Sequence, residues 1–165
     1  MTASALVEPV IRALARGTAI APPRPDRMAL SLRPDGSVEA VRMHGADTPE
    51  SGEIAVALRA TLRTVIERLA AVSGVREAPL WAVVTDVIAS WAVDARAPEL
   101  GRRLAAELGP VVPAPRFVDI AGRTFVRRAS CCLVYEAPGC EQCVSCPKRP
   151  PEEREALLGD YARRS

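Results

Sequence analysis

All five cysteines of this 165-residue chain lie between residues 131 and 146. They form a vicinal pair, Cys131–Cys132, and a spaced pair, Cys143-x-x-Cys146, separated by ten residues that include Cys140. Thiolates gathered this closely are the ligand set of a structural zinc ion or of an iron–sulfur cluster. An odd number of cysteines does not suit a disulfide framework, and in a reducing compartment clustered cysteines more often bind metal. The sequence therefore predicts a metal centre in this segment.

The spacing of the cysteines bears on which metal they hold. A Cys-x-x-Cys loop such as Cys143–Cys146 occurs in zinc ribbons, rubredoxin-like sites and ferredoxins alike. The vicinal pair is more restrictive, because successive side chains of an extended strand point to opposite faces, so Cys131 and Cys132 reach one centre only where the backbone bends. Zinc sites usually draw on two spaced pairs, whereas a two-iron cluster offers separate ligand positions. The pattern favours a 2Fe–2S cluster, and a zinc-stabilised binding domain is the alternative.

The remaining composition is that of a soluble globular protein, with 48% hydrophobic and 25% charged residues. The net charge of +2 is too small to indicate nucleic acid as a partner. No apolar run is long enough for a transmembrane helix, so we expect no stable membrane insertion. The first residues carry Glu8 inside their apolar part and no basic leader, which is unlike a signal peptide. We therefore expect a cytoplasmic protein.

Apolar periodicity, punctuated by proline and glycine, predicts a helix-rich α+β fold with short β-hairpins, in one domain over residues 1–165. The cysteine-rich segment is expected at its C-terminal end. The predicted parts are an N-terminal helix within 1–20, a hairpin over 28–43, a helical core over 53–109, an iron–sulfur segment over 116–150 and a C-terminal helix over 151–165.

Three helices are predicted in the helical core. The first covers residues 53–72, the second begins at Pro79, and the third begins at Pro98 and ends before Gly109. The second helix is apolar on more than one face, which predicts that it is the most buried element. The first hairpin is expected to turn at Pro34-Asp35-Gly36, and a second short hairpin is expected to turn at Ala121-Gly122.

The residues in and around the cysteines carry a family resemblance. They are Arg128, Ser130, Cys131, Cys132, Leu133, Tyr135, Pro138, Gly139, Cys143, Cys146 and Pro147. Together they resemble the C-terminal signature of the ferric siderophore reductases, the FhuF-like iron–sulfur proteins, and the helical stretch at Pro79-Leu80-Trp81 resembles them more weakly. The resemblance implies a 2Fe–2S cluster on Cys131, Cys132, Cys143 and Cys146. It also implies reduction of hydroxamate-bound ferric iron in the cytoplasm.

Two features of the chain depart from that family. Its members are commonly longer, and part of their N-terminal region is expected to be absent here. If that region shapes the siderophore pocket, the shortness affects substrate binding and leaves cluster binding intact. Cys140 stands where members more often have a small residue such as glycine. It is either a free thiol near the cluster, which we favour, or a competing ligand.

The chemistry implied by the resemblance needs one electron and no general acid, nucleophile or hydride donor. Hydroxamates bind ferrous iron far more weakly than ferric iron, so reduction releases Fe²⁺ from a ferric siderophore. The chain has no Gly-x-Gly-x-x-Gly motif and no recognisable flavin site, so a ferredoxin or a flavin-dependent reductase is expected as electron donor. The alternative function is a 2Fe–2S electron carrier or cluster-sensing module without a siderophore pocket.

Several residues are candidates for contacts around the cluster. Arg127 and Arg128 precede the first ligands, and cations there would stabilise the more negative reduced state, although solvated loop charges are the other interpretation. Backbone amides near Gly139 are candidate donors to sulfur. Tyr135 is expected either to shield the cluster or to serve in packing.

Overall fold

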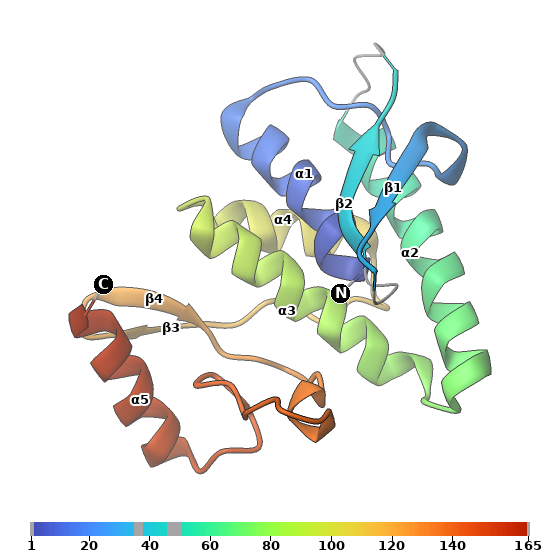
Figure 1. Cartoon of the computed structure of the whole chain (residues 1–165). Helices are drawn as coiled ribbons and strands as arrows, with labels where there is room; N and C mark the ends of the chain where they lie inside the picture. Colours follow the sequence, from blue (N-terminus) through green and yellow to red (C-terminus); the bar gives the residue numbers. More distant parts are fainter. Residues whose placement is uncertain (1, 35–37, 46–50, 165) are drawn as a thin grey trace.

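Four helices form the body of the molecule (Figure 1). The structure is a computed structural model that describes residues 2–34, 38–45 and 51–164. The helices are α1 (Thr2–Arg16), α2 (Ser51–Ser73), α3 (Glu77–Asp94) and α4 (Pro98–Leu108).

Helix α3 runs through the centre of this body and contacts α1, α2 and α4. All residues from Val84 to Ala89 are buried. The core around them consists of aliphatic side chains from all four helices, together with Trp81. These six consecutive buried residues have neighbours on several sides of the helix, which agrees with an apolar surface that is not confined to one face.

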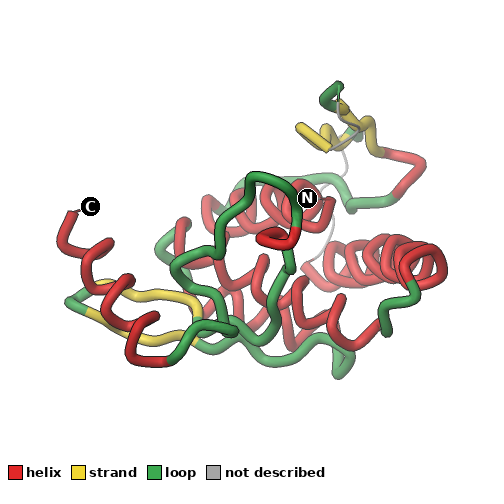
Figure 2. The backbone as a smooth tube through the Cα atoms, turned by 60° about the horizontal axis from the view of Figure 1, so that its bottom comes forward, coloured by secondary structure: helices red, strands yellow, loops and turns green. Residues whose placement is uncertain are grey.

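Two antiparallel hairpins flank the helices (Figure 2). The first consists of β1 (Met28–Leu32) and β2 (Val38–Met43), and it packs on α1. The second consists of β3 (Phe117–Ile120) and β4 (Arg123–Val126), and β4 contacts α3. Helix α5 (Pro151–Arg164) ends the described chain and packs against β3. These elements confirm the helix-rich α+β fold class.

Two predicted helix starts need correction, and the first is that of α2, which begins at Ser51 and not at residue 53. Helix α3 begins at Glu77 and not at Pro79, which lies in its first turn. Proline is compatible with that position because the first amides of a helix have no intrahelical acceptor. The turn expected at Pro34-Asp35-Gly36 lies partly outside the described residues. None of the described helices is both long and apolar enough to cross a membrane.

Helices α3 and α4 approach each other closely at Gly101. A Cβ atom at this position would lie 2.8 Å from the Cβ of Ala92, which is closer than two such atoms can pack. We expect Gly101→Ala to lower the free energy of unfolding by about 1–3 kcal/mol, because overpacking outweighs the better helix propensity of alanine. Chemical denaturation measures the effect.

The matched control is Gly52→Ala in α2, where no atom lies within 4 Å of the added Cβ. This variant should be as stable as the parent protein or more stable by up to about 1 kcal/mol. Equal stability of the two variants would contradict the close helix crossing at Gly101.

Candidate iron–sulfur centre

The cysteines lie in an irregular segment that follows β4 and precedes α5. This segment runs on the side of α3 opposite α1 and the first hairpin (Figures 1 and 2). Its only regular piece among the described residues is a 3-10 turn at Val134–Glu136. Leu133, directly after the vicinal cysteines, adopts a left-handed backbone with φ of 57°. The chain therefore changes direction at the vicinal pair instead of continuing as a strand.

A buried carboxylate on α3 holds the start of this segment. Asp86 is 3% exposed, and its two oxygens accept the backbone N–H groups of Ala129 at 2.7 Å and Ser130 at 3.1 Å. The Nε of Arg128 lies 3.5 Å from the same carboxylate. Burial raises the pKa of Asp86 above its ordinary value, although these hydrogen bonds and the Arg128 charge oppose the shift. The residues just before Cys131 are thus fixed to the most buried helix.

Arg128 connects this carboxylate to the thiols. Its Nη1 lies 3.5 Å from the Sγ of Cys143, and its guanidinium also donates toward Cys132. Burial alone would lower the pKa of Arg128, but the charge of Asp86 and the two thiols raises it. A permanently charged guanidinium therefore lies between α3 and two of the predicted ligands.

The other two predicted ligands are next to each other. The Sγ atoms of Cys131 and Cys146 are 3.6 Å apart, and Cys146 is only 1% exposed. Burial raises the pKa of Cys131. Burial would also raise the pKa of Cys146, but the backbone amide of Lys148, the thiol of Cys131 and the side chain of Gln142 together lower it. Cys146 thus lies in surroundings that favour the thiolate, the form in which cysteine binds metal.

The Cys143–Cys146 loop is a hydrogen-bonded turn, with the amide of Cys146 donating to the carbonyl of Cys143 at 3.1 Å. Arg149 holds this loop in place through hydrogen bonds to its backbone and an ion pair. Its guanidinium donates to the carbonyls of Gln142 at 2.6 Å and Cys143 at 3.0 Å, and it pairs with Glu153 of α5. The loop that carries the spaced cysteines is therefore tied to the last helix.

The residues expected around the cluster have different positions in the structure. Tyr135 accepts a hydrogen bond from the Nζ of Lys148 at 2.8 Å, so it joins the two ends of the segment. Gly139 has φ of 76° and forms a turn after Pro138, which the amide of Cys140 closes by donating to Ala137 at 3.1 Å. That left-handed backbone is the reason for glycine at this position.

Arg127 and Cys140 do not join the group of thiols. Arg127 lines a separate hollow against α5, on the opposite side of the backbone from Arg128, because neighbouring side chains of extended backbone alternate. The Cys140 side chain is exposed, and no contact of its thiol is found within the described residues. The structure thus brings Arg128 to the thiols and leaves Arg127 away from them.

The donor set fits a two-iron centre. All five cysteines are free thiols. Across residues 2–34, 38–45 and 51–164, no three His, Cys, Asp or Glu side chains lie close enough together to hold one metal ion. A 2Fe–2S cluster needs only two thiolates at each iron, and Cys131 with Cys146 forms such a pair. Soft sulfur donors are also the ligands that iron–sulfur clusters require.

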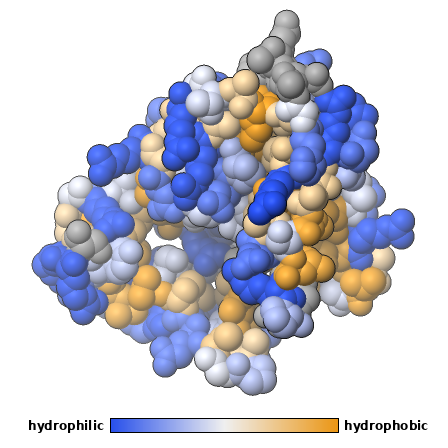
Figure 3. Space-filling view, turned by 45° about the horizontal axis from the view of Figure 1, so that its top comes forward, coloured by the Kyte–Doolittle hydropathy of each residue, from blue (hydrophilic) through white to orange (hydrophobic). Residues whose placement is uncertain are grey.

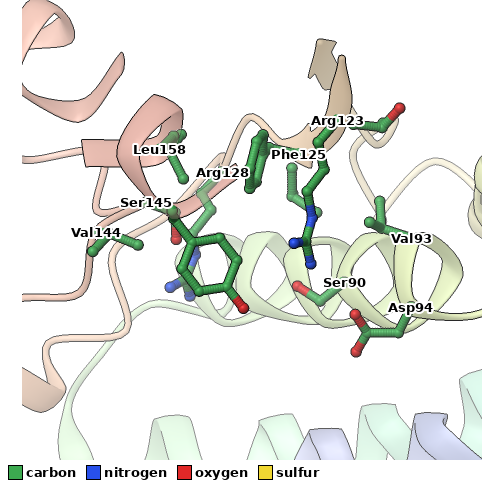
Figure 4. A pocket seen from close by; sticks show the side chains of 12 residues that line it. Ser90, Val93, Asp94, Arg123, Phe125, Arg128, Val144, Ser145 and Leu158 are labelled. Atoms are coloured by element: carbon green, nitrogen blue, oxygen red, sulfur yellow. The ribbon is translucent and has the colours of Figure 1, made fainter. Parts of the chain in front are cut away.

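A cavity of about 300 Å³ adjoins the thiols between α3, β4 and α5 (Figure 4). Ser145 and Arg128 both line it. The Oγ of Ser145 is 3.9 Å from the Sγ of Cys143, and Arg128 contacts the same sulfur. Cys143 is therefore next to two residues that line a space large enough to hold a second molecule.

A cysteine-only donor set on a helix-rich α+β body is typical of a protein that binds zinc or an iron–sulfur cluster. Residues 128–148 match the family model of the FhuF 2Fe-2S C-terminal domain. The cysteine segment is therefore similar to the cluster-binding domain of this family, and the cofactor it indicates is a 2Fe–2S cluster. The match resolves the choice between zinc and iron that the spacing left open. Comparison with curated proteins and with solved structures finds no match to the chain.

Sequence analysis missed Asp86 as part of the site. The signal was present, because Asp86 is an acidic residue inside an otherwise apolar helix, and a fully buried carboxylate is almost always paired. Its partners are 42 to 44 residues away along the chain. That separation left no local pattern from which to find them.

Proposed function

We propose that this protein reduces ferric iron in hydroxamate siderophores by one-electron transfer and so releases Fe²⁺. The observation that carries the proposal is the FhuF-type cysteine segment together with the open cavity beside Cys143. The cofactor, when bound, supplies one electron at a time. A ferric complex in the cavity would lie next to a ligating sulfur, which is the short separation that electron transfer requires.

We further propose that Cys131, Cys132, Cys143 and Cys146 hold the cluster and that Cys140 does not. The Sγ atoms of Cys131 and Cys146 are 3.6 Å apart. The guanidinium of Arg128 lies next to the thiols of Cys132 and Cys143. The positive charge of Arg128 stabilises the added negative charge of the reduced state. Asp86 and Arg149 act on the backbone, where they hold the two cysteine pairs in place.

The electron comes from an external protein in this proposal. A ferredoxin or a flavin-dependent reductase would donate it by transient docking. We place the reaction in the cytoplasm, where thiols stay reduced.

The test is a single turnover under anaerobic conditions. Protein is reduced with dithionite, freed of excess reductant, and mixed with a ferric trihydroxamate and a ferrous chelator. We expect the visible absorption of the oxidised cluster to return while the ferrous chelate appears in an amount equal to the protein. A reduced protein that stays reduced would instead identify an electron carrier or cluster-sensing module. Ferricyanide, a small oxidant that needs no binding site, serves as the control.

A further inference from the structure

The cavity beside Cys143 continues into a longer groove along the C-terminal half of α3. A second hollow of about 840 Å³ shares Asp94, Arg123 and two further residues with the first. A third, of about 210 Å³, lies against α1 and shares Arg12 and Asp94 with the second. Figure 3 shows a hollow with hydrophilic side chains beside the part of the molecule that carries α5. A groove of this size holds a ligand of several hundred daltons.

Arginines dominate the ionisable side chains of the groove. Asp94 is the single acidic residue among its described lining residues. In Figure 4 the guanidinium of Arg123 extends from β4 toward Ser90 and Asp94 of α3, and Arg128 lies at the side of the pocket where Val144 and Ser145 are labelled. The arginines that line the groove are Arg12, Arg16, Arg96, Arg123 and Arg128.

Three of these five arginines form no ion pair within the described residues. Arg12 pairs with Glu8 at 3.0 Å, and Arg128 pairs with Asp86. In the part of the chain that the structure describes, Arg16, Arg96 and Arg123 form no ion pair. The groove therefore has a net positive charge that an anionic ligand would balance.

The fold positions Arg123 through its side chain and Arg96 through its backbone. The guanidinium carbon of Arg123 is 4.9 Å from the ring centre of Tyr161 and 5.7 Å from that of Phe125, and stacking on rings leaves the N–H groups free to donate at the guanidinium edge. Arg96 lies in the turn between α3 and α4 with φ of 55°, a left-handed backbone that favours glycine. An arginine at a strained position points to a use for its side chain.

We propose that this groove binds a ferric hydroxamate chelate that also carries carboxylates and is anionic as a whole. The proposal rests on the reductase function above and names its substrate class. The hydroxamate oxygens surround the iron, so the carboxylates remain at the periphery, where guanidinium groups bind them through paired hydrogen bonds. With those carboxylates on Arg96 and Arg123, the iron lies toward Ser145 and Cys143. The ferric ion gains one electron, the external donor replaces it, and no covalent bond of the chelator breaks.

The first test measures binding without electron transfer. Gallium(III) replaces ferric iron in two chelates. One is a linear trihydroxamate of the ferrioxamine type, which is cationic, and the other is the same chelate with its amine acylated by one carboxyl group of a tricarboxylic acid, which leaves two free carboxylates and makes it anionic. Equilibrium dialysis against the oxidised, cluster-loaded protein gives the two affinities. We expect the anionic chelate to bind at least about tenfold more tightly, and raised salt to weaken its binding because salt screens charge.

The arginine variants locate the binding site. Arg96→Gln and Arg123→Gln should each weaken binding of the anionic chelate about tenfold, the loss expected for one charged hydrogen bond. Arg123→Lys, which keeps the charge but not the planar fork, should lose less. The matched control is Arg63→Gln on the exposed face of α2, which should bind like the parent protein. The visible spectrum of every variant shows whether the cluster is present.

The outcomes separate this proposal from the reductase function. Equal affinity for both gallium chelates, or full affinity in Arg96→Gln and Arg123→Gln, overturns the anionic substrate class. If the corresponding ferric chelates still reoxidise the reduced protein in that case, the reductase function is retained and only the anionic substrate class is rejected. If the gallium chelate binds at the arginines but neither ferric chelate accepts an electron, the groove is confirmed and the reductase function fails.

Discussion

Replacing any one of Cys131, Cys132, Cys143 and Cys146 by serine should abolish the cluster or severely reduce it. Two of these sulfurs lie 3.6 Å apart, and Arg128 contacts the other two. Each iron of a 2Fe–2S cluster depends on two thiolates, and a serine hydroxyl is a harder and poorer ligand for it. Visible absorption together with iron and sulfide content of anaerobically purified protein measures the loss.

Cys140→Ser is the matched control for these variants. Cys140 is exposed and makes no thiol contact within the described residues, so this variant should keep its colour and its iron. A colourless Cys140→Ser protein, together with a coloured variant at one of the other four positions, would show that the ligand set is wrongly assigned.

Asp86→Asn should loosen the cysteine segment and destabilise the fold. The carboxylate accepts two backbone N–H groups and pairs with Arg128, whereas an amide offers a single acceptor oxygen and no charge. Removing one partner of a buried ion pair typically costs about 3–5 kcal/mol. Because the Arg128 side chain keeps 16% exposure, we expect a loss of about 3 kcal/mol, the low end of that range. Chemical denaturation gives the free energy of unfolding, and iron content gives the cluster occupancy.

Two comparisons test the cause of that loss. Asp94→Asn changes an exposed aspartate of the same helix and should leave both stability and iron content near those of the parent. A double-mutant cycle with Arg128→Gln then measures the coupling between the two side chains. We expect the double variant to be less impaired than the sum of the single variants. Simple additivity, or an Asp86→Asn protein with full stability and full iron content, would contradict the role of Asp86 as the anchor.

Element positions along this chain were predictable because their signals are local. Proline and glycine bound the helices, and Pro98 and Gly109 frame α4 as expected. The start of α3 was misplaced, since proline is compatible with several positions of a first helical turn. The buried character of α3 was also visible, because an apolar surface around a whole helix has no other stable environment.

The candidate ligands were predictable for a similar reason. Their spacing within residues 131–146 is the one that chelation by a short loop would require, which is a local constraint. The contacts that hold them were not predictable in the same way. Arg127 and Arg128 are equivalent neighbours in the sequence, and only the alternation of the backbone after β4 shows that Arg128 contacts the thiols.

The sequence by itself determined the helix-rich elements and the cysteine cofactor segment, since each depends on residues close together in the chain. The tertiary structure alone decided which distant groups act on that segment. It placed the Asp86 carboxylate of α3 within hydrogen-bonding distance of the backbone that precedes Cys131. It also brought arginines from α1, the α3–α4 turn and β4 together along one groove. These pairings arise from the packing of helices and hairpins around a shared core, and they have no counterpart in local spacing.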